Sequence, residues 1–164
     1  MAVTTNLAVS GIGLPSLTGT STNDNALSGV VGEFITSNIP VGSAVSLTNN
    51  IVTNVTSISL TAGDWDIEGS IDFALVGVTA TQLVCGASLT SATLPTQSGG
   101  GGLGTDAWVN LPLTLAGVTS TIVSNFPSTR VSINATTTVF LIAQIGFSLG
   151  TVTGYGSIRA RRIR

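Results

Sequence analysis

Hydrophobic and polar residues alternate most regularly in the stretch DWDIEGSIDFAL, residues 64–75. Side chains along a β-strand point alternately to opposite faces, so this pattern predicts a strand with one dry face and one wet face. The dry face is formed by Trp65, Ile67, Gly69, Ile71, Phe73 and Leu75. The wet face is formed by Asp64, Asp66, Glu68, Ser70 and Asp72.

The same period of two runs through most of the remaining chain, in segments where Val, Ile, Thr and Phe dominate. Turn-forming residues separate these segments, and none of them has the period of an amphipathic helix. The expected strands are residues 32–39, 44–48, 52–60, 64–75, 82–89, 107–115, 120–125, 129–134, 137–152 and 154–163. Roughly ten short strands predict an all-β fold, an antiparallel β-sandwich of the jelly-roll-like type.

The segment 137–152 is unusual because it is apolar on both faces. One face of a strand in a two-layer sandwich normally meets solvent, so we expect a second subunit to cover the other face of this one. The aromatic side chains expected in the core are Trp65, Phe73, Phe140 and Phe147.

The first 30 residues have no steady period and are rich in Gly, Ser, Thr and Asn. We interpret residues 1–30 as an arm or attachment segment that is ordered only by contact, with intrinsic disorder as the alternative. The stretch MAVTTNLAVSGIG has no positively charged region, so a secretory signal is not expected. Residues 31–164 then form one β-sandwich domain, long enough to bury its own core.

Charge is scarce in this chain. Only 7% of residues are charged, compared with about 25% in an ordinary soluble domain. The net charge of −2 argues against a general nucleic-acid-binding protein, and no apolar run is long enough for a transmembrane helix. A surface with so few charges favours self-association. The single cysteine, Cys85, is interpreted as a small buried side chain.

Four of the five Lys and Arg residues are arginines in the last six positions, at Arg159, Arg161, Arg162 and Arg164. They alternate with Ala and Ile and follow Tyr155 at the spacing of a strand, which a disordered basic tail would not need. We therefore predict that this last strand lies at a subunit seam. Its arginines would pair there with the acidic row Asp64, Asp66 and Glu68 of a neighbouring copy. Nucleic-acid binding by this tail is the less favoured alternative.

Enzyme chemistry has little support in the sequence. The chain has no His and no Lys, so the usual general base and Schiff-base nucleophile are both missing. The stretch GGGGLG lacks the Lys-Ser/Thr and the helix of a phosphate-binding loop. The acidic row could in principle bind Ca²⁺ or act as a glycosidase pair, but a flat strand spreads its carboxylates apart. We expect no catalytic residues, no metal and no cofactor.

The stretches GTSTNDNALSGVVGEFITSNIPVGSAVSLTNNIVTNVTSISLTAGDWDIEGSIDF and TTTVFLIAQIGFSLGTVTGYGSIRARRIR resemble a family of bacteriophage and prophage virion proteins, often labelled tail-fibre proteins. Members typically carry a T-x-GDWDV-G strand and a carboxy-terminal YG-I-ARR-R strand. The resemblance covers roughly residues 19–90 and 128–164. It implies a phage structural protein with a compact β-rich domain. This chain departs from long fibres, because it has no heptads and no repeats for a shaft.

Together these observations predict a non-enzymatic virion protein, a homotrimeric surface knob that decorates or stabilises the particle. Its arm would bind other virion proteins of the capsid or tail, and it would be made in the bacterial host cytoplasm, with no nucleic-acid or membrane partner. The first alternative is a receptor-binding fibre tip that contacts a bacterial surface glycan or protein, with Trp108 as an aromatic platform in the loop 91–108. The second is a glycan hydrolase that uses Asp66 and Glu68.

Overall fold

The structure is a computed structural model, and it describes residues 22, 24–95 and 107–164. Its elements in chain order are β1 (Phe34–Ile39), the short 3-10 helix η1 (Val41–Ser43), β2 (Val45–Leu47), β3 (Thr53–Leu60), β4 (Gly63–Ser88), β5 (Trp108–Ile133), β6 (Thr137–Ser148) and β7 (Thr151–Arg162). All strand pairs are antiparallel. The predicted all-β, jelly-roll-like sandwich is confirmed.

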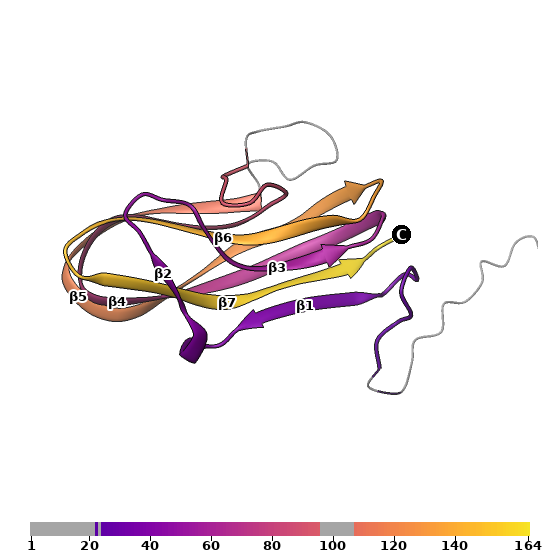
Figure 1. Cartoon of the computed structure of the whole chain (residues 1–164), viewed down its shortest axis with the longest axis horizontal. Coiled ribbons are helices and arrows are strands. Elements are labelled where there is room, and N and C mark those ends of the chain that lie inside the picture. Colours follow the sequence, from indigo (N-terminus) through magenta and orange to yellow (C-terminus); the bar gives the residue numbers. More distant parts are fainter. Residues whose placement is uncertain (1–21, 23, 96–106) are drawn as a thin grey trace, which may run out of the picture.

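One sheet folds over into two layers (Figure 1). The first half of β4 pairs with β7 between Trp65 and Val76, and the second half pairs with β6 from Thr79 to Ser88. β5 follows β4 along both halves. One layer therefore contains β1, β2, β7 and the halves of β4 and β5 nearest residues 65 and 131. The other contains β3, β6 and the remaining halves of β4 and β5.

The fold of the sheet lies at three glycines with positive φ, a region that side chains disfavour. Gly77 in β4 has φ 63°, Gly117 in β5 has φ 65°, and Gly150 between β6 and β7 has φ 73°. A Cβ on Gly150 would overlap the carbonyl oxygen of Val76, so the hairpin between β6 and β7 fits closely against the bend in β4. Register shifts between Leu75 and Gln82 accommodate the same bend.

The bend accounts for the main differences from the expected strands. Residues 107–115, 120–125 and 129–134 were expected as three strands, but they belong to one strand, β5. The expected strand 137–152 instead ends at Ser148, and the chain turns at Leu149 and Gly150 before β7. Alternation alone does not show whether a Ser- or Gly-containing interruption is a turn or a bend within a strand.

The core lies between the two layers, where the dry face of residues 64–75 packs as expected. Trp65, Ile67, Ile71 and Phe73 are fully buried, and Cys85 lies in the same core. Phe140 and Phe147 are both half-buried; Phe147 packs against the core, whereas Phe140 does not, so the expectation that Phe140 belongs to the core is wrong. Phe140 alternates with the buried residues Val139 and Leu141 and therefore faces outward, and Phe147 lies near the end of β6.

The second apolar face of β6 is covered largely within the chain. Ile142 is on that outer face, yet its exposed fraction is 0%. It lies between Gly86 of β4 and Asn54 of β3, and Trp108 is packed directly beside Gly86. The segment after β4 crosses to β3, where the Ala92 N–H donates to Asn54 Oδ1 at 2.8 Å. The argument that this face requires another subunit was therefore wrong.

Candidate assembly site

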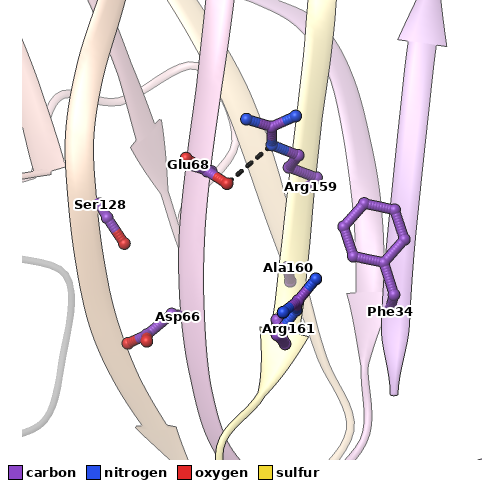
Figure 2. Close-up of a pocket in the computed structure, with 7 residues that line it drawn as sticks. All are labelled: Phe34, Asp66, Glu68, Ser128, Arg159, Ala160 and Arg161. Atoms are coloured by element: carbon purple, nitrogen blue, oxygen red, sulfur yellow. Dashed lines mark hydrogen bonds and ion pairs between the residues drawn. The ribbon is translucent and has the colours of Figure 1, made fainter. Parts of the chain in front are cut away.

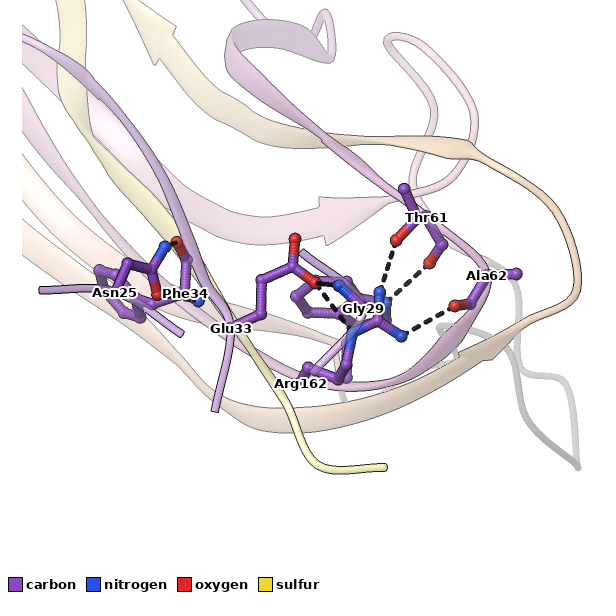
Figure 3. Close-up of polar contacts among 8 residues, drawn as sticks. Asn25, Gly29, Glu33, Phe34, Thr61, Ala62 and Arg162 are labelled. Carbon is purple, nitrogen blue, oxygen red and sulfur yellow. Dashed lines mark hydrogen bonds and ion pairs between the residues drawn. The ribbon is translucent and has the colours of Figure 1, made fainter. Parts of the chain in front are cut away.

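The guanidinium of Arg162 is buried at the end of β7, in a group of residues that we call the terminal clasp: Glu33, Thr61, Ala62, Trp65 and Arg162. The Arg162 side chain is 4% exposed. Nε donates to Glu33 Oε2 at 2.9 Å, Nη1 donates to the carbonyl of Ala62 at 2.8 Å, and Nη2 donates to the Thr61 hydroxyl (Figure 3). The clasp thus joins the residues before β1, the β3–β4 turn and the end of β7.

Local sequence explains why the clasp forms. Ile158, Ala160 and Arg162 alternate along β7 toward the interior, so the last of them projects under the edge of the core. Gly63 is required beside it, because a Cβ there would overlap the Arg162 guanidinium. The GDWD stretch, residues 63–66, therefore contacts the arginine-rich end of the chain. The two segments are also cross-strand neighbours, because Trp65 of β4 pairs with Arg162 of β7.

Both acids at this end of the molecule have a lowered pKa. Burial alone would raise the pKa of Glu33, but the N–H of Gly29 and the Arg162 guanidinium outweigh it and hold that pKa below its ordinary value. The hydrogen bond from Arg130, helped by Ser132, lowers the pKa of Asp64 from 3.8 to about 2. Each carboxylate is therefore held in its charged form.

Asp64 was expected on the wet face, but its side chain is only 4% exposed. Arg130 of β5 donates to its Oδ2 at 2.8 Å, and Arg164 pairs with the same oxygen. The two arginines are themselves 52% and 74% exposed, so they cover the carboxylate while remaining in contact with water. Asp64 is therefore occupied within its own chain.

The other predicted seam residues form a charged face on the outside of the layer that contains β7. Arg159 Nε donates to Glu68 Oε1 at 2.7 Å, and both side chains are about half exposed. They border a pocket of about 460 Å³ lined by Phe34, Asp66, Glu68, Ser128, Arg159, Ala160 and Arg161 (Figure 2). We use the name charged face for Asp66, Glu68, Arg159 and Arg161.

Arg161 and Asp66 are direct cross-strand neighbours on this face. Neither side chain forms an ion pair or hydrogen bond with another residue of the described part of the chain. Further along the same strands Tyr155 lies opposite Asp72, and both are half-buried. Asp66 and Arg161 thus place one negative and one positive side chain beside the pocket, each without an ion-pair partner in the described part of the chain.

The structure brings together, within one copy, every acid and arginine that the sequence assigned to a seam. It adds three residues that the sequence analysis missed, namely Glu33, Phe34 and Arg130. The signal for Glu33 and Arg130 was available, because in a chain with so few charges each one needs a partner. Contact of these residues with a neighbouring copy stays a prediction.

Trp108 lies far from the charged face in the fold, at the start of β5 in the opposite layer. It is half-buried against Gly86, and its indole nitrogen is buried with no hydrogen-bond partner among the described residues. The expected receptor loop 91–108 and the glycine run 99–102 fall largely or wholly outside the described residues. Among residues 22, 24–95 and 107–164, no group of three or more His, Cys, Asp and Glu side chains is placed to bind a metal.

In the described ranges, no helix has the length and apolar character needed to cross a membrane. No protein-family model matches the chain, and no curated protein matches it. Among solved structures, the chain is similar to a structure of the infectious bursal disease virus Gx strain, with 11% sequence identity and a TM-score of 0.44. The similarity covers 92% of this chain but 37% of that one.

Proposed function

We propose that this protein is a non-enzymatic structural component of a bacteriophage or prophage virion, a small homotrimeric knob that decorates or stabilises the particle. The observation that carries the proposal is the distribution of charge. β3, β6 and the adjoining halves of β4 and β5 contain no charged residue, and the charges of the strands all lie in the layer of β1, β7 and the first half of β4. A freely diffusing monomer gains solubility from charges spread over its whole surface.

The charged face supports a seam between copies. Arg161 and Asp66 lie on adjacent strands with their charges unpaired in the described part of the chain, so a neighbouring copy can supply the complementary group to each. Tyr155 and the paired Arg159 and Glu68 would flank this contact. Arg162 and Arg164 act indirectly, because their ion pairs hold the end of β7 in place. This pairing also leaves little free positive charge for a polyanion.

The position of the arm supports attachment at the clasp end. Asn25 is fixed to the first residue of β1 by two hydrogen bonds with the Phe34 backbone (Figure 3), and Phe34 is the cross-strand neighbour of Arg161 near the end of β7; residues 1–21 of the expected arm lie outside the described residues. Leu27, Val30 and Val31 are exposed apolar residues at that point. An arm entering there would bind other virion proteins, and the knob would be made in the host cytoplasm before assembly.

A charge exchange tests the seam. We expect Arg161→Asp and Asp66→Arg each to break the trimer at the charged face by introducing like charges, and the double variant to restore it. Light scattering measures the mass, and circular dichroism checks the fold. Trimers that survive both single exchanges would contradict the seam. Cryo-electron microscopy of particles tests the virion role separately, and a particle without this knob would contradict it.

The pocket gives a specific reason to keep the receptor-binding alternative. Its lining combines the aromatic Phe34, which is 37% exposed, with charged side chains that can hydrogen-bond hydroxyl groups. Such a lining suits a surface glycan of the host. In this alternative, the purified protein binds host cells, Phe34→Ala weakens that binding, and the control Val41→Ala, at an exposed position on η1, does not. Equal binding by both variants would exclude the pocket.

A further inference from the structure

The outer edge of β5 is open. β5 pairs with β4 along its length, and no other strand of the described residues pairs with it. The opposite side of the sandwich is different, because β1 and β3 approach each other there and the hydroxyls of Ser37 and Thr56 are 2.6 Å apart. An unpaired edge exposes a row of backbone donors and acceptors that can pair with another strand.

One backbone hydrogen bond, between Ile163 and Asp64, shows which residues of β5 direct their backbone groups toward the open edge. The Ile163 N–H donates to the Asp64 carbonyl, so the backbone of Asp64 points toward the β7 side of β4. The β4–β7 register is unbroken from Trp65 to Val76, and the direction alternates with each residue. Ile71 and Phe73 therefore point their backbone groups at β5, where they face Ser124 and Ile122.

The alternate residues of β5, Thr121, Val123 and Asn125, consequently direct their N–H and C=O groups away from β4. Their side chains are also exposed, and Val123 is 58% exposed. The register here has no irregularity between Gly69 and Leu75 of β4, so the free groups form a regular row. This row is a template for one more antiparallel strand.

The edge also lacks the usual protection against pairing. Natural edge strands are guarded by charges, by prolines or by bulges. Residues 118–126, VTSTIVSNF, contain no charge, no Pro and no Gly, and several of their side chains are β-branched. Gly117 and Pro127 bound this window. Nine residues of extended strand give an edge of about 30 Å.

We propose that a second copy of this chain adds its own residues 118–126 to this edge, antiparallel and about a two-fold axis. With the axis at Ile122, Thr121 of one copy faces Val123 of the other, and both residues present outward backbone groups. Pairs of β-branched residues in this position are favourable, and no like charges meet. The contact is separate from the charged face, so it would link proposed trimers to one another, and it closes at two copies.

A proline substitution tests the proposal. Val123→Pro removes an outward N–H without removing a bond to β4, whereas Val123→Thr keeps the N–H and the side-chain shape. Light scattering over a concentration series should show the wild type and Val123→Thr at twice the mass of Val123→Pro, whose dissociation constant should rise at least about tenfold. A folded Val123→Pro with the wild-type association would overturn the proposal.

Amide hydrogen exchange of the wild type gives a second reading that does not depend on how the variant folds. The Thr121 amide should exchange slowly where the heavier species dominates and rapidly on dilution, while the Ile122 amide, bonded to β4, stays slow throughout. A Thr121 amide that remains fast in the heavier species would place the contact elsewhere. Deleting residues 1–21 should leave the result unchanged. Loss of Thr121 protection on that deletion would make the arm the occupant and overturn the two-fold pairing.

Discussion

The guanidinium carbon of Arg162 lies 4.2 Å from the centroid of the Trp65 ring. A cation over a desolvated indole is attracted by the negative face of the ring, and here the same guanidinium also pairs with Glu33. Trp65 is fully buried, and its Nε1 donates to the Thr61 carbonyl at 3.0 Å. The ion pair between Arg162 and Glu33 joins the last strand of the chain to the residue just before β1, which is 129 positions away in the sequence.

We expect Arg162→Met to lower the free energy of unfolding by roughly 2–4 kcal/mol, because it leaves Glu33 buried without its ion pair and the Thr61 and Ala62 oxygens without a donor. Arg161→Met is the matched control when both variants are measured at a protein concentration at which the copies are separate, since Arg161 is one position away on the same strand and faces outward. Its effect should stay within about 0.5 kcal/mol. Denaturant unfolding followed by tryptophan fluorescence measures both, and equal losses would contradict the role of the clasp.

Deletion of residues 159–164 would not test the seam by itself. These residues pair with both β1 and β4 and contain Arg162, so their loss would remove part of the core layer together with any contact between copies. Point substitutions on the outer face separate the two effects. The charge exchange at Arg161 and Asp66 is therefore the sharper test of association, and Arg162→Met is the sharper test of stability.

Acid should destabilise the protein through Asp64 and Glu33. Both pKa values are lower in the folded state than usual, about 2 for Asp64 against 3.8, so their contribution is present above the unfolded pKa. It is lost as the pH falls from about 5 to about 2. In Asp64→Asn the denaturation midpoint should depend less steeply on pH over this window. An identical slope in the wild type and the variant would contradict the pKa assignment.

The sequence was sufficient to predict the layers of the sandwich where alternation is strict. Residues 64–75 show a dry and a wet face, and the structure buries Trp65, Ile67 and Phe73 accordingly. It was not sufficient for the connections, because a bend at Gly117 inside β5 and a turn at Gly150 after β6 look alike in a single sequence. Their difference depends on tertiary contacts with β4, which local periodicity does not contain.

The candidate assembly site was also predicted only in part, because local periodicity does not contain contacts between segments that are far apart in the sequence. Alternation along the last strand puts Arg162 on the same face as Ile158 and Ala160, and the structure buries all three. The partner of Arg162 could not be predicted by periodicity, because Glu33 lies far away in sequence and just before the first strand. Likewise Asp64 has the spacing of an exposed residue, but Arg130 of β5 and Arg164, two residues beyond the end of β7, cover it.

Gly77 and Gly150, two of the glycines at the fold of the sheet, should differ in how well they tolerate the methyl group of an alanine. Gly77→Ala meets open space and should cost about 1 kcal/mol, from its positive φ alone. Gly150→Ala adds a steric overlap with the β4 backbone and should cost roughly 3 kcal/mol or prevent folding. The control Gly42→Ala has neither problem and should stay near the wild type. Thermal unfolding of the three variants measures their order of stability. A Gly150→Ala protein as stable as Gly42→Ala would contradict the close fit of the β6–β7 hairpin against the bend in β4.

The thiol of Cys85 should report the opening of the core. Burial raises its pKa to about 12, from an ordinary value of 9.0, so at neutral pH almost no thiolate is present in the folded protein. The thiolate is the form that reacts, and the side chain is also out of reach of a reagent. We expect a thiol-specific reagent to label the native protein at least about 10³-fold more slowly than the unfolded chain. Arg162→Met should accelerate labelling about tenfold for each 1.4 kcal/mol by which it lowers the free energy of unfolding, because labelling then follows the population of the open state. Native and unfolded protein reacting at the same rate would place Cys85 at the surface and contradict the packing of β4 against β6.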